Sequence, residues 1–206
     1  MACATVAETP ATCGAGSGAD IMGDLRTVKG ASFPELKNVN VATGSFRSEA
    51  DYFRTRFSVT RFLLLLPMRF RVEVNPKLYS EKAPGDGVCA ILAHELVHVT
   101  DLKRGNRIRR FGLVRLLSGR YTARFERKTD LEAIARGYGE GLKGYRAWVY
   151  GHVPPGKVEG KKRRYFSPEE IAAIEKGLHQ KPELLDYWRK RVPMSLEEAD
   201  GAVGRL

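Results

Sequence analysis

Residues 88–99 read Val-Cys-Ala-Ile-Leu-Ala-His-Glu-Leu-Val-His-Val, and this stretch constrains everything around it. Nine of its twelve residues are apolar, and the three exceptions are His94, Glu95 and His98. The run from Val88 to about Lys103 therefore predicts a buried helix. A charged glutamate on such a helix costs free energy unless a positive charge compensates it, and a bound cation would do so.

The two histidines are four residues apart, so both imidazoles project from one face of the helix, one turn apart. Two imidazoles in that arrangement suit one tetrahedral zinc ion, and Glu95, about 100° around the helix, would lie beside the metal. There Glu95 is placed to act as general base toward zinc-activated water. The competing interpretation is an ordinary core helix with two hydrogen-bonded histidines and a surface glutamate.

A catalytic zinc ion needs a third protein ligand and an open position. The best candidate is Glu126, which begins the pattern Glu126-Arg-Lys-Thr-Asp130. Ala123, Ala133 and Gly137 continue the same stripe at helical spacing, so both carboxylates would face inward where helices pack closely. We expect Glu126 to bind the zinc ion. We expect Asp130 to accept a hydrogen bond from the second ring nitrogen of a ligand histidine.

Two other acids compete for the role of third ligand, Glu132 first and Asp101 after it. Asp101 lies one turn past His98 and more simply supports its own helix or faces solvent. Position 104 is an arginine, which excludes the metzincin extension, where a ligand stands at this spacing. An oxyanion-stabilising group is also expected of such a site. The candidates for it are Tyr138, Tyr145 and His152.

The motif His94-Glu95-x-x-His98 followed by Glu126-x-x-x-Asp130 resembles the gluzincin type of HExxH zinc metallopeptidase. The third-ligand helix is similar to that of the Ste24/HtpX-like group, without the transmembrane helices of that group. The resemblance covers roughly residues 69–140. It implies a zincin-like core, zinc-dependent peptide hydrolysis, and an edge strand upstream of the active-site helix that pairs with substrate backbone. Residues 69–75 are the expected edge strand.

The sequence as a whole predicts an α+β fold that is mostly helical, with a small sheet beside the HExxH active-site helix. Residues 69–75 alternate between apolar and charged side chains, which predicts a half-buried strand. Ser48 followed by Asp51 resembles a capping pattern, and Phe53 and Phe57 then lie near one helical face. We therefore expect a helix from about residue 48.

The chain divides into three segments by composition. Residues 1–30 are rich in Ala, Gly, Thr and Ser and are predicted to be a flexible leader. Residues 31–155 would form the zincin-like catalytic domain. Residues 156–206 would add a basic loop and a C-terminal helical extension of the same domain. One long helix is expected from Tyr121 to about Trp148, and Ser167-Pro168-Glu169-Glu170 predicts the start of another.

The net charge of +11 is concentrated in two patches. Lys103–Lys128 holds ten Lys or Arg residues against one acid, and Lys157–Arg164 holds five against one. Such patches suggest an anionic membrane surface or nucleic acid as partner, or simply two solvated faces. Ile108–Leu117 interleaves arginine with large apolar residues, which suits a helix lying on a membrane or one packed on the core. Neither patch contains a nucleic-acid-binding motif.

The chain has three cysteines, whose spacing matches no zinc-finger pattern. Cys89 falls in the apolar run and is interpreted as a core residue, while Cys3 and Cys13 could pair in an exported protein. No signal peptide or membrane-spanning run is visible, which leaves the cytoplasm as one expected location. Met1-Ala2-Cys3 resembles the end of a lipoprotein cleavage box, so envelope anchoring through Cys3 is the other.

The sequence therefore predicts a zinc-dependent metallohydrolase, most simply a peptidase that acts on a peptide or protein substrate. Two alternatives stay open. The same ligands could staple two helices of a non-catalytic zinc protein that binds a partner, although such a site has no need of Glu95. A nucleic-acid-associated zinc protease, similar in principle to the SprT-like proteases, would also make use of the basic patches.

Overall fold

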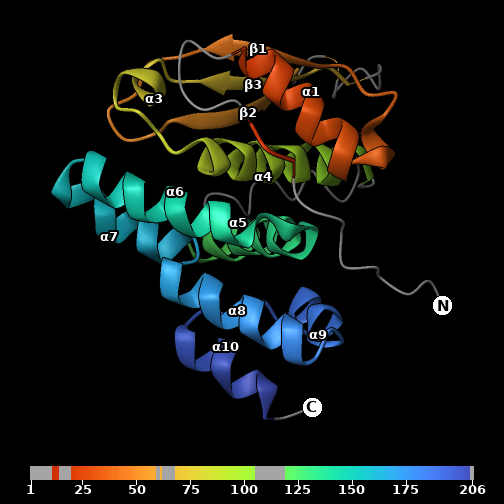
Figure 1. Cartoon of the computed structure of the whole chain (residues 1–206), viewed down its shortest axis with the longest axis vertical. Coiled ribbons are helices and arrows are strands. Elements are labelled where there is room, and N and C mark those ends of the chain that lie inside the picture. Colours follow the sequence, from red (N-terminus) through yellow and green to blue (C-terminus); the bar gives the residue numbers. More distant parts are fainter. Residues whose placement is uncertain (1–10, 14–19, 59–60, 62–67, 105–118, 205–206) are drawn as a thin grey trace.

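A computed structural model of the chain describes residues 11–13, 20–58, 61, 68–104 and 119–204. A three-stranded sheet covers one side of a central helix, and further helices stack in layers on the other side (Figure 1). The expected α+β class, mostly helical with a small sheet, is confirmed. The strands are β1 (Val41–Ser45), β2 (Phe53–Phe57) and β3 (Phe70–Val74). The helices are α1 (Ile21–Ser32), α3 (Lys77–Ser80), α4 (Gly85–Arg104), α5 (Gly119–Ala133), α6 (Gly139–His152), α7 (Pro155–Arg164), α8 (Pro168–Gln180), α9 (Leu184–Lys190) and α10 (Leu196–Val203), with a 3₁₀ turn η1 (Pro34–Leu36) and a π turn η3 (Ile134–Tyr138).

The sheet has the order β1-β3-β2, with β1 parallel and β2 antiparallel to the central strand β3. The predicted strand at residues 69–75 is confirmed as β3, and Phe70, Val72 and Val74 are buried as their alternation indicated. Its expected role as edge strand is wrong, because β3 is hydrogen-bonded on both sides. In the described part of the chain, the edge strand that contacts α4 is β2.

The helix expected from residue 48 is also wrong, because this segment leads into strand β2. Phe53 and Phe57 are four residues apart, a spacing that fits one face of a helix and equally one face of a strand. Arg54 and Arg56 alternate with them and pair with Glu73 of β3 at 2.6 and 3.2 Å. These cross-strand ion pairs favour the strand.

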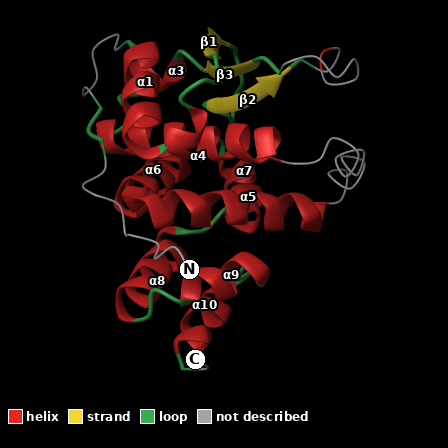
Figure 2. Ribbon diagram, turned by 90° about the vertical axis from the view of Figure 1, so that its right-hand side faces the viewer, coloured by secondary structure: helices red, strands yellow, loops and turns green. Residues whose placement is uncertain are grey.

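The buried helix expected from Val88 to Lys103 is confirmed as α4, which begins three residues earlier at Gly85. It lies between the sheet and the layer of α5, α6 and α7 (Figure 2). Apolar side chains surround it on all sides because α1, β2, α5 and α6 all pack against it. Leu92, Ala93, Leu96 and Val99 each have 0% exposure. The apolar residues on every face of α4 are thus explained by the position of this helix at the centre of the molecule.

The single long helix expected from residue 121 to 148 is in fact two helices, α5 and α6. Gly137 interrupts it with a φ of 88°, a left-handed conformation that only glycine adopts without strain. The predicted basic loop after residue 156 is wrong as well, because α7 runs through Pro155–Arg164. The predicted leader is wrong at its end, since α1 begins at Ile21 and buries Leu25 and Val28.

The predicted start of α8 is confirmed in detail. The Ser167 side chain accepts a hydrogen bond from the Glu170 backbone N–H, and the Glu170 carboxylate accepts one from the Ser167 backbone N–H. Glu170 also forms a buried ion pair with Arg127 of α5 at 2.7 Å, which joins α8 to the layer above it. Because this pair is hydrogen-bonded on both partners, it fixes the position of the C-terminal helices rather than leaving a buried charge alone.

A disulfide joins Cys13 to Cys89, so the proposed pairing of Cys3 with Cys13 is wrong. Cys89 is buried on α4, as expected, but it is bonded rather than a free core thiol. Cys3 and the amphipathic segment Ile108–Leu117 lie outside the described residues. Among the described helices, none combines the length and apolar character needed to cross a bilayer.

Candidate metal centre

Three side chains from two helices meet below α4. His94 and His98 project from α4, and Glu126 projects from α5, which packs against it. The Nε2 atoms of the two histidines are 3.1 Å apart. Glu126 Oε2 lies 3.2 Å from Nε2 of His94 and 3.3 Å from Nε2 of His98. The structure therefore brings together the three residues that the sequence predicted as ligands, and this group could hold a metal ion.

The spacing of these three atoms fits a tetrahedral metal. Bonds of about 2.0–2.1 Å to zinc place two tetrahedral ligands about 3.3 Å apart. The three observed separations of 3.1, 3.2 and 3.3 Å approach that value. Two imidazole nitrogens and one carboxylate oxygen are also the donor types that zinc prefers at sites with an open position. The residues present thus match the group that the motif implies.

Asp130 lies one turn beyond Glu126 and accepts three hydrogen bonds. Its Oδ1 is 2.7 Å from Nδ1 of His94 and 2.9 Å from the guanidinium of Arg146, and its Oδ2 is 3.2 Å from the Phe166 backbone nitrogen. An ionised carboxylate only accepts hydrogen bonds, so Nδ1 of His94 must donate. The Nε2 atom of His94 is therefore the one left for a metal, as the sequence predicted for this aspartate.

Electrostatics favour ionised acids at the centre. Burial alone would raise the pKa of Asp130, but Arg146 and then His94 outweigh burial and lower it. Burial would likewise raise the pKa of Glu126, and the two histidines lower it well below its usual range. Burial alone would lower the pKa of His94, yet Asp130 and Glu126 raise it to about 10. A metal cation would take the place of the proton on Nε2 of this imidazole, while Nδ1 keeps its proton for Asp130.

Glu95 lies on α4 beside the ligand histidines and is only 5% exposed. The Thr55 hydroxyl of β2 donates to its carboxylate at 2.6 Å. Within the described part of the chain no ion pair involves this carboxylate. Glu95 thus lies beside the candidate ligand group and outside it, where the motif predicts a general base.

Aromatic rings enclose the group. Phe125 stacks on His98 with ring centroids 5.2 Å apart, and Tyr165 meets His94 edge-on at 6.0 Å. The guanidinium of Arg146 lies 4.2 Å from the centroid of the Tyr165 ring. These ring contacts help to fix the orientation of both imidazoles.

Neither rival acid belongs to the ligand group, and two of the three expected oxyanion donors, Tyr138 and His152, contact residues outside that group. Glu132 is paired with Arg189 and Arg136, and the ligand group does not include Asp101. The hydroxyl of Tyr138 contacts Ser32 at 2.8 Å, and His152 stacks on a tryptophan near the end of α6. Tyr145 is packed against Phe53 and Trp148. Burial raises its pKa, and the Glu95 carboxylate contributes to the increase.

Three residues at the centre were not predicted from the sequence: Thr55, Arg146 and Tyr165. Each comes from an element whose position depends on tertiary packing, respectively β2, α6 and the connection between α7 and α8. Only Thr55 left a local signal, because it is a polar residue between two phenylalanines on an alternating segment. The sequence around Arg146 and Tyr165 carries no pattern that links it to the HExxH helix.

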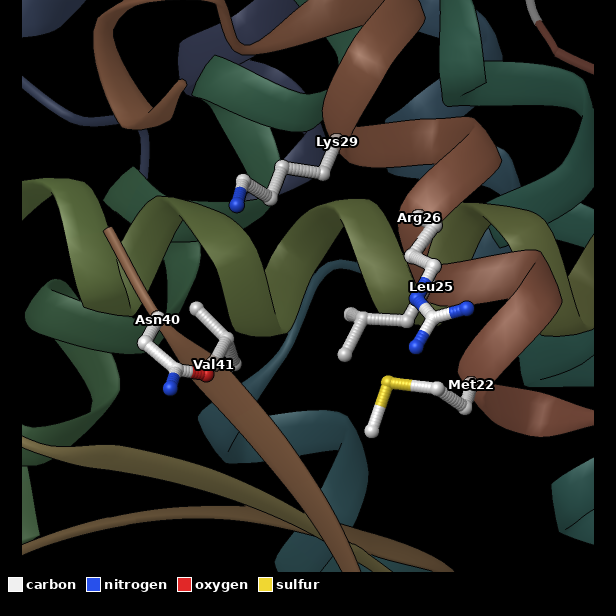
Figure 3. Close-up of a pocket in the computed structure, with 6 residues that line it drawn as sticks. All are labelled: Met22, Leu25, Arg26, Lys29, Asn40 and Val41. Carbon is white, nitrogen blue, oxygen red and sulfur yellow. The ribbon is translucent and has the colours of Figure 1, made fainter. Parts of the chain in front are cut away.

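A separate pocket of about 160 Å³ lies between α1 and the start of β1 (Figure 3). It is lined by Met22, Leu25, Arg26, Lys29, Asn40 and Val41. Lys29 donates a hydrogen bond to the Val39 carbonyl oxygen at 2.7 Å. None of the metal-centre residues lines the pocket.

Comparisons with known proteins returned no match: no family model, no curated protein and no solved structure is significantly similar to the chain.

Proposed function

We propose that the chain is a zinc-dependent metallohydrolase, most simply a peptidase. The observation that carries the proposal is the set of mutual distances among His94, His98 and Glu126, with Glu95 adjacent and outside that set. A zinc ion held by these ligands would polarise a carbonyl group and make a water molecule more acidic. Glu95 would accept the proton of that water and return it to the leaving amine.

The zincin-like core of the proposal gains support from the layout around α4. Among the described residues, strand β2 is an edge strand of the sheet and contacts the HExxH helix, and an extended peptide can add to such an edge through main-chain hydrogen bonds. A substrate bound there would run past Glu95, because Thr55 of β2 is hydrogen-bonded to that residue. The substrate-pairing role that the resemblance implies thus passes from β3 to β2.

The deciding experiment combines metal analysis with hydrolysis of an unfolded protein. We expect about one zinc ion per chain, and hydrolysis that a chelator abolishes and added zinc restores. Glu95→Gln should retain zinc and lose activity by a factor of roughly 10² to 10⁴. The matched control is Glu132→Gln, which changes a carboxylate on α5 outside the ligand group. Zinc without hydrolysis would instead favour the non-catalytic protein in which the ligands staple α4 to α5.

One observation favours the nucleic-acid-associated alternative. Helix α7 carries five Lys or Arg residues, four of them in its last turn, and none of its residues is buried. Lys161 and Lys162 pair with acids, whereas no ion pair joins Lys157, Arg163 or Arg164 to another described residue. DNA binding that weakens steeply with salt, and that is lost when Arg163 and Arg164 become glutamine, would support this version. Salt-independent or absent binding would remove it.

A further inference from the structure

We propose that Thr55 is a positioning residue that holds the general base, an inference that rests on the proposed hydrolase function. The Thr55 Oγ1 atom lies 2.6 Å from Oε2 of Glu95 and 3.4 Å from the carbonyl oxygen of the same residue. The ionised carboxylate can only accept, so the hydroxyl donates. With Oε2 engaged in this way, Oε1 is the oxygen left to receive a proton from water.

Thr55 lies on the face of β2 that packs on the core. Phe53, Thr55 and Phe57 share one face of β2 by alternation, and both phenylalanines pack on the core. Thr55 is half-buried between them. A valine has nearly the same shape and a stronger apolar character, so packing alone would favour it. The bond to Glu95 is the interaction that accounts for the hydroxyl.

The location of Thr55 links the base to the substrate edge. Glu95 belongs to α4, whereas Thr55 belongs to β2, an edge strand of the sheet as described. Strand β2 would contact both the bound peptide and the Glu95 carboxylate. A peptide that pairs with β2 is therefore held at a fixed position relative to this carboxylate. A small displacement of a catalytic group is costly to the rate even when binding is unaffected. Loss of the hydroxyl should therefore appear in kcat rather than in KM.

The first test uses two reciprocal substitutions. Thr55→Val removes the hydroxyl and keeps the shape, and we expect it to lower kcat on the order of 10- to 100-fold with little change in KM or zinc content. Thr55→Ser keeps the hydroxyl and removes the methyl group, and it should stay near wild-type kcat. Thr55→Ala removes the hydroxyl a second way if the valine variant does not fold. An unimpaired valine variant, or a serine variant impaired as severely, overturns the proposal.

The second test does not depend on activity. In chelator-treated protein, Thr55→Val should lower the Tm, because a nearly buried carboxylate loses its donor. In a Glu95→Leu background the same change should leave the Tm unchanged or raise it. Equal shifts in both backgrounds would contradict the contact and overturn the inference. Absence of hydrolysis by zinc-loaded wild-type protein would refute the proposed function, whereas an active wild type with a fully active valine variant refutes only the role of Thr55.

Discussion

At the scale of single residues, Asp130 has the most consequential hydrogen bonds. It fixes the tautomer of His94 while Arg146 and the Phe166 backbone hold it in turn. Because outer partners of this kind orient a ligand, Asp130→Asn should weaken zinc binding by roughly 10- to 100-fold. Competition with a zinc chelator measures this. Asp101→Asn is the matched control, and an equal loss there would show that Asp101 contributes to the site.

The raised pKa of His94 gives the metal-free protein a defined pH dependence. Its pKa moves from 6.5 to about 10, since Asp130 and Glu126 outweigh the opposing effect of burial. A group whose pKa rises on folding stabilises the protein fully below pH 6.5, and this contribution is lost as the pH rises toward 10. Zinc requires the unprotonated imidazole, so its stabilising effect should grow over the same interval.

Thermal unfolding with chelator and with zinc, measured between pH 6.5 and 9, checks this expectation (the interval lies within the shift from 6.5 to about 10). The chelator-treated Tm should fall with pH and the gap between the two curves should widen. Asp130→Asn removes one of the carboxylates responsible and should flatten the fall. A wild-type slope identical to that of the variant would contradict the assignment to His94.

Residue spacing predicted the ligand group because helical geometry is local. Two histidines four apart share a face in any α-helix, and Glu126 with Asp130 does the same on α5. The packing of α5 against α4 then brought the two pairs together. Thr55 and Arg146 could not be predicted in this way. Their partners lie 40 and 16 residues away along the chain, and no local pattern encodes that pairing.

At the scale of elements, Gly141 sets how closely α6 approaches α4. A Cβ atom on it would lie 2.4 Å from the Asp86 carbonyl oxygen and 2.9 Å from the Ala90 Cβ. Backbone cannot yield as a flexible side chain would, so Gly141→Ala should destabilise the protein by about 2–3 kcal/mol. Gly144→Ala on the same helix meets nothing within 4 Å and should stabilise it by up to about 1 kcal/mol.

Urea unfolding of the two variants measures these opposite signs. Destabilisation by both changes would point to helix α6 itself, not to its contact with α4. Because α6 also supplies Arg146, the Gly141 variant should lose zinc affinity together with stability, whereas the Gly144 variant should keep both. Equal zinc affinity in the two variants would separate the α4–α6 contact from the metal centre.

Helix boundaries were less predictable than helix existence. A nearly continuous apolar run predicted α4 and the capping box predicted α8, since both signals are contained in neighbouring residues. Gly137 was counted in a small-residue stripe, and the sequence did not reveal its left-handed conformation. The segment of strand β2 was predicted as a helix because Phe53 and Phe57, four residues apart, fit one face of a helix as well as one face of a strand. Only its pairing with β3 resolves that ambiguity.

At the scale of the whole molecule, the layers converge on α4. The sheet, α1, α5 and α6 all contact it, and the ligand group draws on α4 and α5 while its support comes from α6 and the connection into α8. A metal at this point would therefore stabilise most of the fold. The sequence predicted a mostly helical α+β domain with a small sheet. It did not predict the order of the layers, which depends on contacts between residues far apart in sequence.

The disulfide between Cys13 and Cys89 fastens a distant segment to the same central helix. The two cysteines are separated by 76 positions in the sequence. Closing a loop of that length lowers the conformational entropy of the unfolded chain, which raises the free energy of unfolding by about 4 kcal/mol. Cys13→Ala, or a reductant added to the wild type, should therefore lower the Tm. Zinc content should not change, because neither cysteine belongs to the ligand group.

Thiol counting and thermal unfolding test this together. Of three cysteines, the unfolded and unreduced protein should expose one reactive thiol, and reduction should expose all three. Cys3→Ser is the control, and it should leave both the Tm and its sensitivity to reductant unchanged. If reduction released zinc as well, the disulfide would be coupled to the metal centre through α4, since Cys89 precedes His94 by little more than one helical turn. If reductant leaves the Tm unchanged, the Cys13–Cys89 disulfide does not form in the purified protein.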